Sequence, residues 1–174
     1  MEITDLLLKF EHHAQLKKLD AWFASSSSNR IWIKGLAGSF KSVLFSTFFA
    51  SHRQSFLFVL NDMESAAYFY HDLVQITGGA DVLFFPSSYK RAMKYGEKDS
   101  ANEVMRNETL DSIQHSESPL MVVTYPESVF ERVISSADLN AKSLSLKTSQ
   151  KIKISAVTYI LHDFGFEKVD FVSQ

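Results

Sequence analysis

The sequence predicts an α/β protein built on a doubly wound, mostly parallel sheet, and two observations support this class. Short apolar runs with strand character alternate four times with segments of helical periodicity, as in successive β-α units. After about residue 137 the pattern changes to shorter, amphipathic pieces. We therefore expect a first domain over residues 1–137 and the beginning of a smaller, truncated α+β domain over residues 138–174.

The first elements are read from periodicity and from the residues that end helices. Apolar residues at helical spacing predict a helix over residues 11–23, which a run of serines ends. Residues 30–34 are expected to form a short strand, and residues 41–50 a very apolar helix. The continuous apolar run at 55–60 predicts a strand buried on both faces.

The rest of the first domain follows the same alternation. Asn61-Asp62 offers an N-cap for a helix that runs through Val74, and Gly78-Gly79 ends that unit. Pro126 suits the first turn of a helix. The remaining expected elements are a strand over 82–85, a polar loop from Pro86 to Asp99, a helix over 100–115, a strand over 119–124 and a short helix over 126–133.

The second unit is expected to hold two strands and one helix. Alternating Lys-Ser-Leu-Ser-Leu-Lys at 142–147 is typical of an amphipathic strand. A helix over 153–164 is stopped by Gly165, and a strand follows over 167–172.

Composition excludes several classes of protein. The chain has 174 residues, of which 45% are hydrophobic, including 15 Phe, enough for a packed core. The net charge of -2 is slightly negative, so the overall charge does not favour nucleic acid or an anionic membrane as a partner. The absence of cysteine excludes disulfides and thiolate metal sites. No targeting segment or membrane-spanning run is visible, so we expect a soluble, cytoplasmic protein.

Residues 35–42 read Gly-Leu-Ala-Gly-Ser-Phe-Lys-Ser, the outline of a phosphate-binding P-loop with one position changed. The residues of this loop remnant are Gly35, Gly38, Ser39, Lys41 and Ser42. Phe40 stands where a P-loop needs a second glycine, because backbone N–H groups must close around a phosphate without a Cβ in the way. No strand ends in an acid suited to hold Mg²⁺. We therefore favour a structural strand-to-helix turn over nucleotide binding, and expect no catalytic residue and no metal site.

A second candidate site is the basic loop at residues 87–98. Basic and aromatic side chains alternate there, a composition that could contact a phosphate backbone and stack on bases. The alternative is a solvated surface loop without a binding role. The residues of this candidate contact loop are Tyr89, Lys90, Arg91, Lys94, Tyr95 and Lys98.

A set of runs occurs in a fixed order along the chain. They are residues 35–42, the Phe-Leu-Phe-Val-Leu-Asn-Asp run at 56–62, Leu-Phe-Phe-Pro at 83–86, Tyr95, residues 103–110, Met-Val-Val-Thr-Tyr-Pro-Glu at 121–127 and Gly-Phe-Glu-Lys-Val-Asp at 165–170. In this order and spacing they resemble the amino-terminal region of bacterial transcription-repair coupling factors. That region is itself similar to the helicase subunit of nucleotide excision repair. The resemblance covers nearly the whole chain from residue 35 to residue 172.

The resemblance implies a RecA-like first domain with a degenerate nucleotide site. It also implies a second domain, from about residue 138, that docks the recognition protein of nucleotide excision repair. The full-length family is an ATP-dependent DNA translocase that displaces stalled RNA polymerase. Its motor, with ATP and Mg²⁺, and its contacts to polymerase and DNA lie outside this chain, and other domains of the same full-length chain are expected partners. No cofactor is expected in the fragment.

Three hypotheses follow from the sequence. The first is a non-catalytic interaction module of a transcription-repair coupling factor. The second is a small P-loop NTPase or kinase that tolerates Phe40. The third is a weak nucleic-acid-binding module that uses the loop at 87–98.

Overall fold

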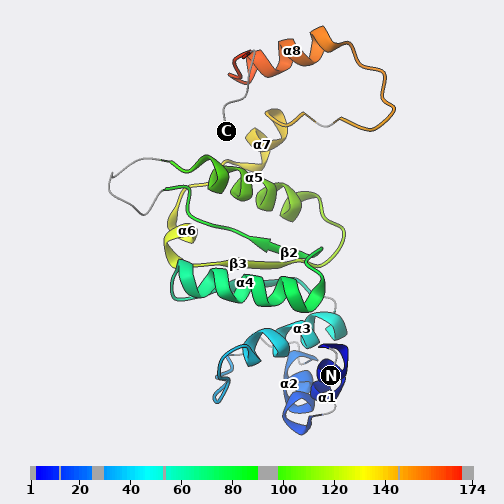
Figure 1. Ribbon diagram of the computed structural model, residues 1–174, viewed down its shortest axis with the longest axis vertical. Helices are drawn as coiled ribbons and strands as arrows, with labels where there is room; N and C mark the ends of the chain where they lie inside the picture. The colour runs from blue at the N-terminus through cyan, green and yellow to red at the C-terminus, as the bar shows by residue number, and fades with distance from the viewer. Residues whose placement is uncertain are drawn as a thin grey trace. The chain divides into compact units, whose positions relative to one another are not determined.

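The computed structural model describes residues 3–11, 13–24, 30–52, 54–89, 98–144 and 146–169. The chain divides into two compact units, residues 1–132 and residues 133–174, and each is described by itself. The first unit is mixed α/β (Figure 1). The domain boundary expected near residue 137 stays a prediction.

A small parallel sheet organises the first unit. Its strands are β1 (Phe56–Val59), β2 (Val82–Phe84) and β3 (Met121–Thr124), in the order β1-β3-β2. Phe56 and Val82 both lie opposite Met121, so the two outer strands start level with the central one. Every residue of β3 is buried, as a strand covered on both faces and both edges must be.

Helices cover the sheet on two sides. The helices α4 (Met63–Thr77) and α5 (Ser100–His115) lie on opposite sides of the strands (Figure 1). The helix α3 (Phe40–His52) packs against α4. One hydrophobic core joins α4 to β2 and β3 through Ala66, Phe69, Leu73, Val82, Met121, Val123 and Tyr125.

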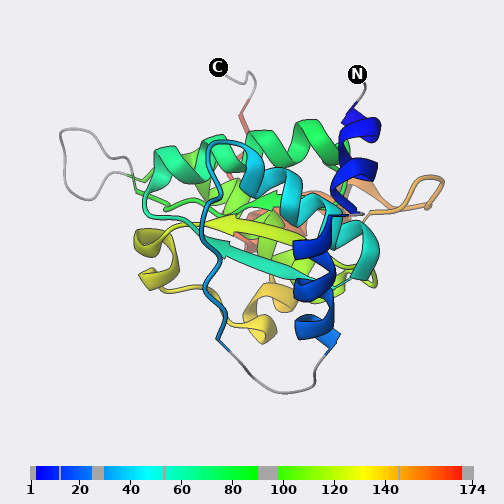
Figure 2. The same ribbon diagram turned by 90° about the horizontal axis from the view of Figure 1, so that it is seen from below.

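Two helices precede the phosphate-loop remnant. The helices α1 (Ile3–Glu11) and α2 (Ala14–Ala24) lie beside α3 (Figure 2, blue and cyan). A second core forms there from Leu16 and Leu19 of α2 with Leu44 and Phe48 of α3. The sequence reading did not include α1.

Polar caps set the helix boundaries where the sequence predicted them. The Asp62 carboxylate accepts a hydrogen bond of 2.7 Å from the Ser65 amide, and Gly78 ends α4 with φ of 82°. Asp99 caps α5 in the same way as Asp62. Pro126 occupies the first turn of the short helix α6 (Pro126–Phe130). The expected helices that begin near residues 62, 100 and 126 are therefore confirmed, although the last ends at Phe130 and not at residue 133.

Two strand predictions in the first unit are wrong. Residues 30–34 form no strand; they run as an extended segment, and the Trp32 side chain is 83% exposed. The strand at 55–60 exists as β1 but is not buried on both faces, because Leu57 and Val59 are 64% and 52% exposed. The described sheet therefore has three strands where four were expected, and β1 is an edge.

The second unit holds two helices in its described part, α7 (Ser136–Ala141) and α8 (Ile154–Asp163). Gly165, with φ of 89°, follows α8 where a stop was predicted. The strand expected over 142–147 is absent from its described residues. Residues 167–169 of the last expected strand are not a strand, and residues 170–172 lie outside the described part of the chain. No described residue of this unit is buried.

Candidate functional site

The phosphate-loop remnant is a turn that leads into α3. Gly35 and Gly38 have φ of 87° and 53°, conformations that residues with a side chain rarely adopt. A Cβ at either glycine would meet no atom within 4 Å, so backbone conformation, and not a close neighbour, favours glycine at both positions. The helix then begins at Phe40, and the Val43 amide donates to the Ser39 carbonyl over 3.1 Å.

Phe40 packs against the helix α1. Its ring centroid lies 5.4 Å from that of Phe10 of α1, and its side chain remains 51% exposed. The residue at the altered P-loop position thus has a packing contact of its own. That Phe40 blocks phosphate binding stays a prediction.

The last residue of the remnant is bonded to another helix. Ser42 is 1% exposed, and its hydroxyl donates a hydrogen bond of 3.0 Å to Oδ2 of Asp72 on α4. In a working P-loop the hydroxyl at this position binds Mg²⁺. Lys41, the preceding residue, is exposed on the surface. The structure therefore brings Ser42 to a carboxylate of the scaffold while Lys41 faces solvent.

The basic contact loop is described only at its two ends. Lys90, Arg91, Lys94 and Tyr95 lie outside the described residues. Tyr89 and Lys98 face each other in an isolated antiparallel bridge that closes the loop. The Lys98 ammonium is paired with Glu103, and the hydrogen bond and charge of that carboxylate raise the pKa of Lys98. One cation of the candidate contact loop is therefore engaged by its own chain.

A polar network that the sequence did not predict lies at the carboxyl ends of β2 and β3. The Glu131 carboxylate accepts hydrogen bonds of 2.9 Å from both the amide and the hydroxyl of Ser88. The hydroxyl of Ser87 donates to the same carboxylate over 3.2 Å. The Ser87 amide donates to the Tyr125 hydroxyl over 2.8 Å. Glu131 thus fixes the chain as it leaves β2.

Arg106 of α5 also belongs to this network. Its Nη1 lies 2.9 Å from Oε2 of Glu131, 2.6 Å from the Pro86 carbonyl oxygen and 2.9 Å from the Ser128 hydroxyl. The guanidinium carbon lies 4.1 Å from the centre of the Phe85 ring. Burial lowers the pKa of Arg106, and the charge of Glu131 opposes that shift.

The position of the network matches the edge where open parallel sheets bind ligands. Its carboxylate, hydroxyl and carbonyl groups bond to one another and to Nη1 of Arg106. Among buried side-chain nitrogen and oxygen atoms of the described residues, Nη2 of Arg106 and the Ser46 hydroxyl have no hydrogen-bond partner. No local sequence signal marks Arg106 and Glu131 as a pair, since 25 residues separate them. The network holds the loops together at this edge.

Two further features of the described chain bear on its class. No group of three or more His, Asp or Glu side chains gathers to hold a metal ion in the described part. None of the described helices is long and apolar enough to span a bilayer.

Comparisons of the chain with models of protein families, with curated proteins and with solved structures found no match.

Proposed function

We propose that the chain is a non-catalytic interaction module, the amino-terminal part of a protein of the transcription-repair coupling class, with a RecA-like scaffold. The resemblance of its motifs to that class supports this proposal. The parallel sheet with helices on both sides agrees with such a scaffold.

The observation that carries the proposal is the side chain of Phe40, which stands where a P-loop has a glycine and whose ring centroid lies 5.4 Å from that of Phe10. A P-loop closes backbone N–H groups around a phosphate, and a Cβ at this position obstructs that closure. Ser42 is 1% exposed and its hydroxyl donates to Asp72 of α4, so the loop is also integrated into the packing of α3 on α4. The side chain at residue 40 favours a structural turn over an NTPase site.

The second unit is proposed as the docking surface for the recognition protein of nucleotide excision repair. Its helix α8 exposes large apolar side chains, with Ile154 83% and Tyr159 75% exposed. Surfaces of this kind mark protein interfaces. DNA, RNA polymerase and ATP would then be bound by other parts of the full-length chain.

A pull-down against the excision-repair recognition protein tests the docking role. The present chain is compared with a version extended beyond residue 174, and we expect the extended form to be captured. The substitutions Ile154→Asp and Tyr159→Asp in the extended form should abolish capture. Leu57→Asp, at an apolar position of the first unit that is 64% exposed, is the control and should leave capture unchanged. Equal loss with all three substitutions, or no capture at all, contradicts the assignment.

A titration of Mg²⁺-ATP tests the NTPase alternative. We expect no micromolar binding and no hydrolysis by the chain, because Phe40 occupies the position of the second P-loop glycine. Micromolar binding that Lys41→Ala removes would establish the alternative instead. Salt-sensitive binding of duplex DNA, weakened by Lys90→Ala and Arg91→Ala, would likewise establish the nucleic-acid alternative.

A further inference from the structure

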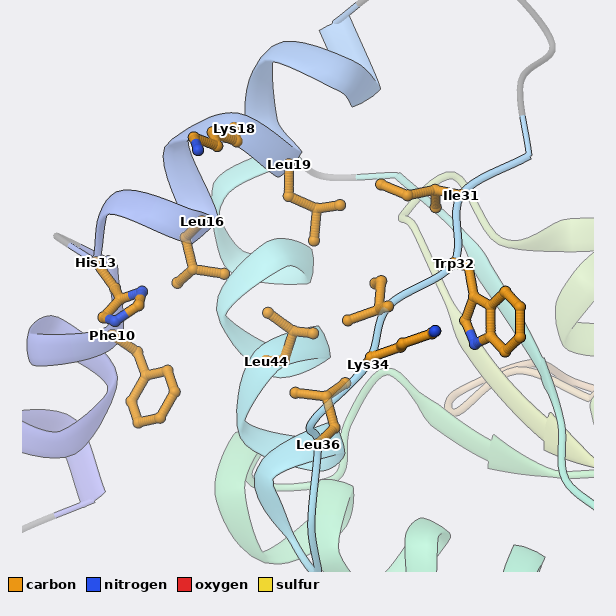
Figure 3. A pocket seen from close by; sticks show the side chains of 11 residues that line it. Phe10, His13, Leu16, Lys18, Leu19, Ile31, Trp32, Lys34, Leu36 and Leu44 are labelled. Atoms are coloured by element: carbon orange, nitrogen blue, oxygen red, sulfur yellow. The ribbon is translucent and has the colours of Figure 1, made fainter.

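A pocket of about 420 Å³ lies between the helices α2 and α3 and the extended segment at residues 31–36 (Figure 3). Its floor is made of three buried leucines, Leu16, Leu19 and Leu44. Ile33 and Leu36 close the opposite wall, and Figure 3 shows the leucine side chains from the two walls pointing toward one another. The volume falls within the range of small-molecule sites, roughly 300–1,000 Å³.

The charged residues of the pocket are all basic. Lys18 and Lys34 line it, and no acid lines it among the residues that the structure describes. The Lys34 ammonium lies 4.5 Å from the ring centre of Trp32, whose indole is almost fully exposed at the rim. An apolar floor with cationic residues at its rim complements a ligand that has an apolar body and one negative charge.

We infer that this pocket binds a small amphipathic anion, of the class of a medium-chain alkyl carboxylate. The alkyl chain would displace water from the leucine floor, and the carboxylate would face Lys34 at the rim. Leu36 lies within residues 35–42, but Gly35, Gly38, Ser39, Lys41 and Ser42 do not line the pocket, and neither does the proposed docking surface. This site therefore stands or falls independently of the proposed function.

A chain-length series measures the apolar contribution. The Trp22→Phe variant leaves Trp32 as the single tryptophan of the chain, so its fluorescence reports on the rim of the pocket. Titration with hexanoate, octanoate and decanoate, each as a monomer, should give saturable binding. The dissociation constant should fall about fourfold per added methylene until the cavity is full, because each buried methylene contributes about 0.8 kcal/mol.

A charge comparison measures the contribution of the lysines. At equal chain length the carboxylate should bind about two- to fivefold more tightly than the trimethylammonium compound, the effect of an exposed charge pair. Lys34→Met should reduce this preference. Lys17→Met, on the same helix but outside the pocket, is the matched control and should not change it.

A pocket-filling variant locates the site. Leu36→Phe should weaken decanoate binding at least tenfold, measured by calorimetry, while Leu57→Phe on the exposed face of β1 leaves it unchanged. Should Leu36→Phe fail to fold, the lysine variants still decide the matter.

Four outcomes would overturn the inference. They are the absence of saturable binding, a preference for the cationic compound, equal effects of the Lys17 and Lys34 substitutions, and binding to anionic phospholipid vesicles without binding of the monomer.

Discussion

Arg106 of α5 and Glu131, which follows α6, form an ion pair of 2.9 Å whose side chains are 7% and 13% exposed. The two residues hold together segments that leave β2 and β3, because Glu131 also bonds Ser88 and Arg106 also bonds the Pro86 carbonyl. The loop geometry at the carboxyl edge of the sheet therefore depends on this pair.

Removing one member of the pair should be strongly destabilising. Arg106→Met leaves the largely buried Glu131 carboxylate without its counter-charge, and the Pro86 carbonyl and both Ser128 oxygens without this donor. We expect a loss of about 3–5 kcal/mol in the free energy of unfolding. Urea denaturation followed by circular dichroism measures it. Arg132→Met, the exposed arginine next to Glu131, is the control and should change stability by less than about 0.5 kcal/mol. Similar values for the two variants would show that the pair contributes little.

The bond between Ser42 and Asp72 should contribute measurably to the packing of α3 on α4. Ser42→Ala is expected to lower the free energy of unfolding by about 1 kcal/mol, the usual contribution of such a hydrogen bond. Ser100→Ala, at the exposed first residue of α5, should be close to neutral. Urea denaturation measures both variants, and equal unfolding midpoints would contradict the prediction.

The ion pair at the base of the basic loop gives a pH-dependent prediction. Glu103 raises the pKa of Lys98 above the usual 10.5, so the pair stabilises the fold at lower pH and the effect is lost as the pH rises through the raised pKa. Glu103→Gln should return the Lys98 pKa toward 10.5. An NMR titration of the Lys98 side chain measures the shift, and an unchanged pKa would contradict the assigned pairing.

A buried valine of β3 and an exposed valine of β1 give a matched pair of substitutions. Val123→Thr places a hydroxyl in the fully buried centre of β3 and should lower stability by about 1–3 kcal/mol. Val59→Thr, on the exposed side of β1, should stay within about 0.5 kcal/mol. If Val59→Thr lowered the free energy of unfolding as much as Val123→Thr does, the exposed side of β1 would have to be covered in solution.

Local signals predicted the part of the fold that local chemistry determines. Asp62 and Asp99 cap their helices because short carboxylate side chains reach free amides of the first turn, whatever the rest of the chain does. Gly78 ends α4 for an equally local reason. The apolar spacing of Leu7 and Phe10 could have revealed α1, and that signal was missed.

Non-local relationships were beyond the sequence. The alternation at residues 30–34 is typical of a strand, but a strand also needs a neighbour with free hydrogen-bonding groups, and Trp32 instead lies at the rim of a pocket. The same limit hid the exposure of Leu57, which follows from the place of β1 at the sheet edge. The candidate loop was located correctly as the turn before α3, but its bond to Asp72, 30 residues away, had no local signature.

The central strand of the sheet is also the last to be synthesised. Ser55 and Leu120, which bond where β1 meets β3, are 65 residues apart in the chain, and Phe85 and Thr124 are 39 apart. At a ribosomal rate of about 5–20 residues per second, the apolar run of β1 waits roughly 3–13 s for its partner. A nascent chain of this length would carry an unpaired, phenylalanine-rich strand during that interval, which makes it a substrate for chaperones that hold exposed β-segments.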